Sequence, residues 1–196
     1  MSLSPSLARG GLSSRLSASS SSPCRKVYCD LDGVLADFDK GCIAVMGTTP
    51  DQLSKNNMWK GLANARSFYE HLEWMSDGQE LWNSIVGLQP TILTGLPMGK
   101  WAEPQKRMWC ARELGEGVPV ITCMSRDKHR HCSPGSVLID DRLSLQADWQ
   151  RAGGVFIHHT STASSLQELK ALLDSQPPPG DNPTAAGRKR DFSEVA

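Results

Sequence analysis

The sequence predicts an α/β fold in which a parallel sheet lies between two layers of helices. The chain has 196 residues, 39% of them hydrophobic, which suits one domain of ordinary size with tails. Five short apolar runs alternate with helical segments, as is typical of parallel sheets. The first run ends abruptly in Asp30 and Asp32, and open parallel sheets bind ligands at the carboxyl ends of their strands. We therefore expect a three-layer, Rossmann-like sandwich with a functional site at that edge.

The first apolar run, Val27 to Cys29, is predicted to be a strand buried on both faces, because it is apolar throughout rather than alternating. Asp30 and Asp32 follow it, and Gly33 frees the backbone to turn. Oxygen ligands of this kind suit Mg²⁺ and leave room for a substrate phosphate. One carboxylate can then attack phosphorus while the other carries a proton. The same residues are also a turn signature, so the pair alone is compatible with a plain turn.

Residues 38 to 88 separate the first two strands and are mostly helical in character. Four apolar residues near the end of this segment mark one face of a helix: Leu81, Trp82, Ile85 and Val86. The segment therefore predicts a helical insertion directly after the first strand.

The second strand is expected at Thr91 to Thr94 and the third at Val118 to Thr122. A hydroxyl and a free N–H just past a strand end can hold phosphate oxygens, so Thr94 and Gly95 are candidate phosphate ligands. Between these strands we predict a helix over residues 101 to 114, because its first turn carries a glutamate and a proline.

The fourth strand, Val137 to Asp140, ends in a second pair of carboxylates, Asp140 and Asp141. Neighbouring side chains on an extended chain point in different directions. We expect one of the two to bind Mg²⁺ directly and the other to act through water or hold a neighbour. The sequence leaves open which one does which.

The remaining elements are a helix at 143 to 152, a fifth strand at Val155 to His158 and a last helix near 165 to 173. Two glycines end the first of these helices. Ser165 and Glu168 are spaced as a capping box, which predicts that the last helix begins there.

Both ends of the chain are expected to be disordered. Residues 1 to 25 are rich in serine and arginine and contain no acidic residue, which favours a targeting peptide for a chloroplast or mitochondrion. The alternatives are an ordinary disordered N-terminus and a cytoplasmic protein. No apolar segment typical of a secretory signal is present in this stretch. The tail, 176 to 196, follows three prolines.

Charge bears on the kind of partner. The whole chain sums to zero and the first 26 residues contribute +4, so the remainder carries −4. This part of the chain therefore lacks the excess of positive charge expected of a protein that binds duplex nucleic acid, and we expect no membrane partner. A small phosphorylated substrate fits better. A monomer and a homodimer are both compatible with the sequence.

Four strings resemble the signatures of the haloacid dehalogenase-like phosphatases, in the family's order. DLDGVLADF resembles the first signature, and Thr94, which closes TILT, resembles the second. Lys128 in SRDKH matches the basic third signature, and the aspartates that follow VLI match the fourth. The fuller strings ARSFYEHLEWM, QKRMWCARELG and VLIDDR are similar to the 5′(3′)-deoxyribonucleotidase group. That group commonly has a Thr-Ser-Pro type second signature, whereas this chain has a glycine, Gly95, after Thr94.

The resemblance implies a Mg²⁺-dependent phosphomonoesterase, most similar to a 5′-nucleotidase acting on nucleoside monophosphates. Asp30 would form an aspartyl phosphate, and Asp32 would protonate the leaving oxygen and then activate water. The implied metal ligands are Asp30, the backbone carbonyl of Asp32, and Asp140 or Asp141. The implied phosphate ligands are Thr94, Gly95, Lys128 and Lys106, with Arg126 reaching the phosphate or the base. The insertion over about residues 38 to 88 would be the family's small cap, completing a phosphatase domain over 26 to 175.

Three aromatic residues match positions that line the base pocket in the resembling nucleotidases: Phe38, Phe68 and Tyr69. Bases stack on aromatic rings, so these residues suit a nucleoside. The alternative is that the rings only pack the cap onto the core.

Two other functions remain open. A phosphatase of the same mechanism acting on a sugar phosphate or another small metabolite would keep all four signatures. A non-catalytic interaction protein on the same fold would normally have lost an aspartate, and all four are present. Replacing Asp30 by asparagine separates these classes, because only an enzyme would lose turnover.

Overall fold

A computed structural model describes residues 25 to 175. The predicted targeting peptide lies outside the described residues except for Arg25, and the predicted tail lies outside them entirely. Both therefore stay predictions. Among the helices of residues 25 to 175, none combines the length and the apolar character needed to cross a bilayer.

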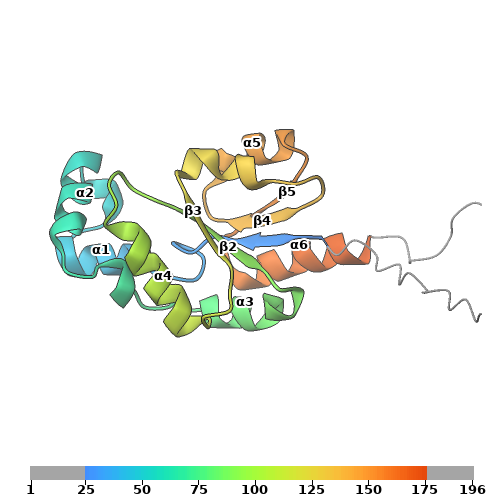
Figure 1. Ribbon diagram of the computed structural model, residues 1–196, viewed down its shortest axis with the longest axis horizontal. Helices are drawn as coiled ribbons and strands as arrows, with labels where there is room; N and C mark the ends of the chain where they lie inside the picture. The colour runs from blue at the N-terminus through green and yellow to red at the C-terminus, as the bar shows by residue number, and fades with distance from the viewer. Residues whose placement is uncertain (1–24, 176–196) are drawn as a thin grey trace, which may run out of the picture.

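The centre of the molecule is a five-stranded sheet in the order β3-β2-β1-β4-β5, with every neighbouring pair parallel. The strands are β1 (Val27–Cys29), β2 (Thr91–Gly95), β3 (Val120–Cys123), β4 (Val137–Asp140) and β5 (Val155–His158). The expected α/β class with a parallel sheet is confirmed. Because β1 is the middle strand, the residues that follow it reach the centre of the sheet edge (Figure 1).

Alternate strand residues build two separate cores. Tyr28 and Leu93 face a cluster that contains Trp149, whereas Cys29 and Ile92 face the larger cluster that contains Trp109. Successive side chains of a strand point to opposite faces, so each apolar strand serves both cores. This explains why the sequence shows continuous apolar runs.

Helices cover both faces of the sheet (Figure 1). One layer consists of α3 (Gly78–Ile85), α4 (Ala102–Glu113) and α6 (Thr162–Asp174). The other consists of α5 (Gln146–Arg151) with two 3₁₀ segments, η4 (Ser125–His131) and η5 (Leu143–Leu145). The expected three-layer arrangement is thus observed.

The segment between β1 and β2 divides into two parts. Helices α1 (Phe38–Met46) and α2 (Lys55–Asn64) lie beyond the carboxyl ends of the strands (Figure 1). Three short 3₁₀ turns connect the elements of this segment: η1 (Pro50–Gln52), η2 (Tyr69–His71) and η3 (Val86–Leu88). Helix α3 instead packs into the sandwich layer beside α6. Only the first part of the predicted cap therefore stands over the strand ends.

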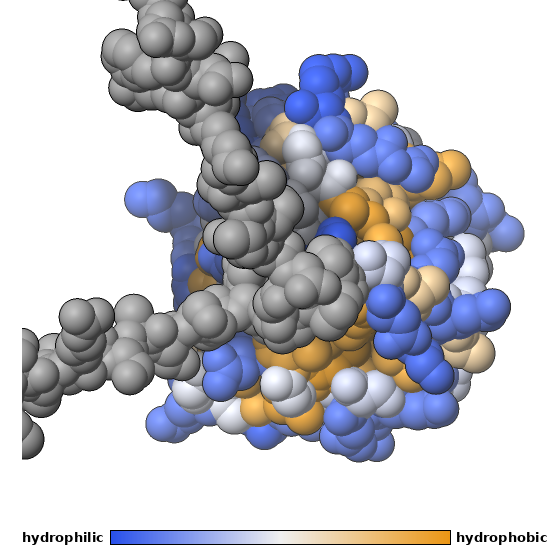
Figure 2. Space-filling view, turned by 90° about the vertical axis from the view of Figure 1, so that its right-hand side faces the viewer, coloured by the Kyte–Doolittle hydropathy of each residue, from blue (hydrophilic) through white to orange (hydrophobic). Residues whose placement is uncertain are grey.

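The side of the molecule opposite α1 and α2, where residues 25 and 175 lie, presents apolar areas bordered by polar side chains (Figure 2). In Figure 1 both ends of the described chain lie on the side opposite α1 and α2, away from the carboxyl edge of the sheet.

The capping-box prediction for the last helix is wrong. Ser161, with an extended backbone, is the N-cap of α6 and accepts a hydrogen bond from the Ser164 N–H. Ser165 lies inside the helix and is fully buried, and its hydroxyl shares a 2.9 Å hydrogen bond with Nδ1 of His159. A tertiary contact therefore uses the serine that the local spacing assigned to a cap.

Candidate active site

Asp30 is the first residue past the middle strand, and pairing with β4 holds its backbone. Its N–H donates to the Ile139 carbonyl at 2.9 Å, which continues the β1–β4 ladder by one residue. One carboxylate oxygen, Oδ1, accepts from the Leu31 N–H at 2.8 Å. The side chain is only 4% exposed, yet it lines a cavity. The fold thus presents a buried, oriented carboxylate to a space that a ligand can enter.

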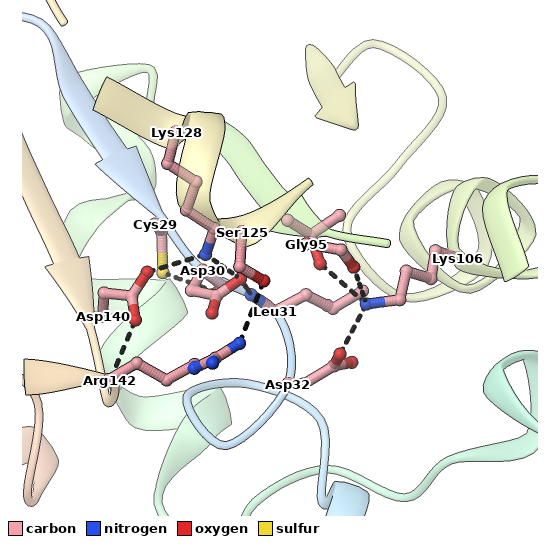
Figure 3. A network of polar contacts seen from close by, with 11 residues as sticks. Cys29, Asp30, Leu31, Asp32, Gly95, Lys106, Ser125, Lys128, Asp140 and Arg142 are labelled. Carbon is pink, nitrogen blue, oxygen red and sulfur yellow. Dashed lines mark hydrogen bonds and ion pairs between the residues drawn. The ribbon is translucent and has the colours of Figure 1, made fainter. Parts of the chain in front are cut away.

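Lys128, from η4, neutralises two of the site's carboxylates (Figure 3). Its ammonium lies 2.8 Å from Asp30 Oδ1 and 2.7 Å from Asp140 Oδ2, and the side chain is 1% exposed. Burial lowers the pKa of Lys128, but the two carboxylates raise it by more, so the net pKa lies above its ordinary value. The lysine is therefore a permanent buried cation between two acidic residues.

Three carboxylates converge at this edge, from Asp30, Asp140 and Asp141, with one oxygen of each lying within 4.8 Å of the others. Burial, and then the negative charge of Asp30, raises the pKa of Asp140 to about 6 and that of Asp141 to about 7. Carboxylates that repel one another in a buried site are stabilised by a cation. The donor set, all oxygen, suits Mg²⁺.

The two aspartates after β4 differ in how their oxygens are engaged. Asp140 Oδ2 binds Lys128, and Asp140 Oδ1 accepts from the Arg142 N–H at 2.9 Å. Asp141 Oδ1 is buried and has no hydrogen-bond partner among the described residues. Of the two, Asp141 is the one left with a free oxygen for a metal ion.

Gly33 allows Asp141 to approach the first loop. Its φ of +76° lies in the left-handed region, which favours glycine. A Cβ at this position would lie 2.6 Å from Asp141 Oδ2. The glycine in the Asp-x-Asp-Gly turn is therefore required both by the backbone and by the second carboxylate pair.

Lys106, from α4, is a second buried cation and is not exposed at all. Its ammonium binds Asp32 Oδ2 at 2.5 Å, Thr94 Oγ1 at 2.9 Å and the Gly95 carbonyl at 2.8 Å. Burial raises the pKa of Asp32, and the charge of Lys106 partly offsets this increase. Asp32 Oδ1 is buried with no partner among residues 25 to 175. Lys106 therefore ties the second aspartate to the end of β2.

The cavity in front of Asp30 has a volume of about 590 Å³. The predicted site residues on its wall are Asp30, Asp32, Gly95, Arg126, Phe38, Tyr69 and Asp141. The predicted residues that do not line it are Thr94, Lys106, Lys128, Asp140 and Phe68. Thr94 is fully buried, with its hydroxyl bound to Lys106. The structure thus places it behind the wall, where its hydroxyl accepts a hydrogen bond from Lys106, and its contact with phosphate stays a prediction.

The three aromatic residues predicted for a base pocket do not share one role. Phe38 and Tyr69 line the cavity. Phe68 packs edge-on against both, with ring centroids 5.6 Å from Phe38 and 4.9 Å from Tyr69, and is 5% exposed. It belongs to the core that holds the other two rings. Trp59 of α2 takes the third place on the wall, 5.9 Å from Phe38.

Among the wall residues that the sequence interpretation missed are Lys55, Trp59, Ser125 and Arg142. Ser125 opens the string SRDKH, and Arg142 directly follows the second aspartate pair. Their position next to these two motifs was the signal in the sequence that could have marked them as site residues. Lys55 and Trp59 had no such signal, because only the docking of α2 over the strand ends brings them to the cavity.

No family model matches this chain, and no curated protein matches it. Among solved structures, the fold is similar to the crystal structure of a hydrolase from Streptococcus pneumoniae, with a TM-score of 0.43 and 16% sequence identity. The similarity covers 76% of this chain and 98% of that chain.

Proposed function

We propose that this protein is a hydrolase and, more narrowly, a Mg²⁺-dependent phosphomonoesterase that acts through an aspartyl phosphate. The observation that carries the proposal is the group formed by Asp30, Asp140 and Asp141 at the carboxyl edge of the sheet. One member, Asp30, is held by strand pairing and opens to the cavity. A plain turn would not need three converging carboxylates, two of them buried and one partly buried, so the geometry favours chemistry over the turn interpretation.

In this proposal Asp30 attacks the phosphorus atom, forming an Asp30 O–P bond while the bond from phosphorus to the ester oxygen breaks. Asp32 donates its proton to the departing oxygen. It then takes a proton from the water that attacks the aspartyl phosphate, and inorganic phosphate is released. The raised pKa of Asp32 suits such an acid and base. Lys106 holds its carboxylate at the edge of the cavity.

The residues that would hold Mg²⁺ are Asp30, Asp141 and, from the family resemblance, the backbone carbonyl of Asp32. The free oxygen of Asp141 and the crowding of carboxylates fit such an ion. When bound, Mg²⁺ would offset the repulsion between a carboxylate nucleophile and an anionic phosphate. Lys128 reduces the same repulsion permanently, since it stays charged between Asp30 and Asp140.

The substrate we favour is a nucleoside monophosphate. The cavity volume of about 590 Å³ lies in the usual range for small-molecule sites. Its wall carries the rings of Phe38 and Trp59, on which a base can stack. Tyr69 also lines the cavity, but it is 1% exposed, with Trp101 stacked on its ring and Lys106 Nζ 4.4 Å from its centroid. The same wall carries Arg126, the cation predicted to reach the phosphate or the base.

The test is phosphate release by the full chain from nucleoside monophosphates, deoxynucleoside monophosphates and sugar phosphates, with Mg²⁺ and with a chelator. We expect metal-dependent turnover concentrated on nucleotides and abolished in Asp30→Asn, with the variant folded by circular dichroism. Turnover spread over sugar phosphates would refute the nucleotide preference and keep the mechanism. Undiminished turnover in Asp30→Asn would refute the mechanism itself.

A further inference from the structure

Ser125 occupies space that a side chain on the neighbouring strand would otherwise fill. Gly95 ends β2, and its register partner on β3 is Cys123, two residues before Ser125. A Cβ built on Gly95 would overlap Ser125 Oγ. Both residues line the cavity that contains Asp30. Glycine at position 95 therefore lets the hydroxyl of Ser125 reach the cavity wall at the end of β2.

Arg142 orients this hydroxyl. Its side chain reaches from the end of β4 toward Ser125, and Nη1 donates to Ser125 Oγ at 3.0 Å (Figure 3). A guanidinium can only donate, so the serine oxygen must be the acceptor in this hydrogen bond. The hydroxyl hydrogen is then free to point elsewhere, and the Ser125 hydroxyl donates no hydrogen bond to any residue from 25 to 175. Ser125 is thus left with one unused donor at the cavity.

We propose that Ser125 is a ligand for a phosphoryl oxygen of the substrate, with Arg142 as its positioning residue. The inference rests on the proposed phosphomonoesterase function and adds a subsite to it. A free hydroxyl donor backed by a guanidinium selects an acceptor-only, anionic group, and a phosphoryl oxygen has this chemistry. The other hydroxyl expected at the phosphate, that of Thr94, is buried and bound to Lys106. Ser125 supplies the hydroxyl at the wall in its place.

The geometry also leaves room for a side chain at position 95 or at position 125, but not at both. A serine at 95 cannot coexist with the present Ser125 side chain, because the Cβ alone would overlap its oxygen. Removing the side chain at 125 should make room for a hydroxyl from position 95. The two positions can therefore exchange the hydroxyl, which gives a test that simple loss of packing would not pass.

The first experiment compares Ser125→Ala with the wild-type protein in hydrolysis of p-nitrophenyl phosphate with Mg²⁺. A hydrogen bond to a charged oxygen should be lost, so kcat/KM should fall roughly 10- to 100-fold. Ser84→Ala is the matched control, because Ser84 is exposed on α3 and bonds only the Glu80 carbonyl of its own helix. It should keep wild-type kcat/KM. A Ser125→Ala value within about twofold of wild type would overturn the proposal.

The second experiment exchanges the hydroxyl between the strands. Ser125→Gly alone and Gly95→Ser alone should both lose activity, the latter through crowding. The double variant Gly95→Ser with Ser125→Gly should regain about tenfold or more over Ser125→Gly. Failure to regain activity, in a double variant folded by circular dichroism, would overturn the claim that a hydroxyl at this point binds phosphate.

Calorimetry with inorganic phosphate and Mg²⁺ separates this inference from the function on which it rests. Wild-type protein should bind phosphate, and Ser125→Ala should bind it about tenfold more weakly. Phosphate binding that depends on Ser125, in a protein that hydrolyses no ester, would refute the function and keep the subsite. Hydrolysis indifferent to Ser125 would keep the function and refute the subsite. No phosphate binding in a protein that also hydrolyses no ester would refute both.

Discussion

Replacing Gly33 by alanine should remove the metal site while leaving the fold in place. The alanine Cβ would lie 2.6 Å from Asp141 Oδ2, whereas ordinary contacts begin near 3.4 Å, so the carboxylate oxygen must move by about 0.8 Å. Mg²⁺ binds oxygen ligands at about 2.0–2.1 Å with near-ideal octahedral geometry. The Asp141 Cγ would lie only 2.9 Å from the same Cβ, so the whole carboxylate must shift, and Oδ1, the oxygen left for a metal ion, is displaced with it. We expect the Mg²⁺ affinity to fall by at least roughly 10- to 100-fold.

The backbone cost of the same change can be measured separately with Gly47→Ala. Gly33 and Gly47 have nearly the same φ, +76° and +74°, but a Cβ at Gly47 would meet nothing within 4 Å. Each alanine should lower the free energy of unfolding by about 1–2 kcal/mol, the cost of a left-handed non-glycine residue. Gly47 ends α1 and does not line the cavity.

The assay is isothermal calorimetry of Mg²⁺ binding, with urea unfolding of each variant measured alongside it. We expect Gly47→Ala to lose stability and keep the metal affinity, and Gly33→Ala to lose both. Wild-type affinity for Mg²⁺ in Gly33→Ala would refute the assignment of Asp141 as a metal ligand. An equal loss of affinity in Gly47→Ala would show that backbone strain, and not contact with the carboxylate, is the cause.

Three further outcomes follow from the site. Lys106→Met should lower the free energy of unfolding by roughly 1–3 kcal/mol in urea titrations, because the carboxylate of Asp32 loses its buried partner; unchanged stability would contradict this. The folded pKa values of Asp140 and Asp141, about 6 and about 7, lie above the unfolded value of 3.8, so the metal-free protein should lose stability as pH rises from about 4 to about 7. Mg²⁺ binds the ionised carboxylates, so the increase in Tm that it produces should grow over this pH interval in thermal melts. An increase in Tm that does not depend on pH would refute the binding of Mg²⁺ by these carboxylates. Trp59→Ala should raise KM roughly tenfold for nucleoside monophosphates and leave KM for sugar phosphates, which carry no aromatic ring, unchanged, whereas equal effects on both would argue against base stacking.

Local patterns were sufficient for much of the fold. The first, fourth and fifth strands have the predicted bounds, and the second and third differ by one or two residues at their ends. A strand buried on both faces needs apolar residues throughout, and this requirement is visible in any short window of sequence. The start of the last helix was mispredicted because Ser165 makes a tertiary contact with His159 instead of capping.

The convergence of Asp30, Asp140 and Asp141 was predictable because each aspartate ends or directly follows a strand. Carboxyl ends of parallel strands meet at one edge, so knowing the strands was enough to bring these side chains together. The roles of the two residues after β4 were not predictable. Which carboxylate keeps a free oxygen depends on Lys128, which lies on a different element.

By itself, then, the sequence determined the sheet, its carboxyl edge and the acidic residues at that edge, since each follows from neighbours along the chain. Only the tertiary structure decided which side chains form the cavity wall. The burial of Thr94 behind Lys106, the packing of Phe68 behind Tyr69 and the contact of Ser125 with Gly95 all join residues from different elements. Contacts of this kind depend on how the helices pack on the sheet, and the periodicity of apolar residues in the sequence does not predict that packing.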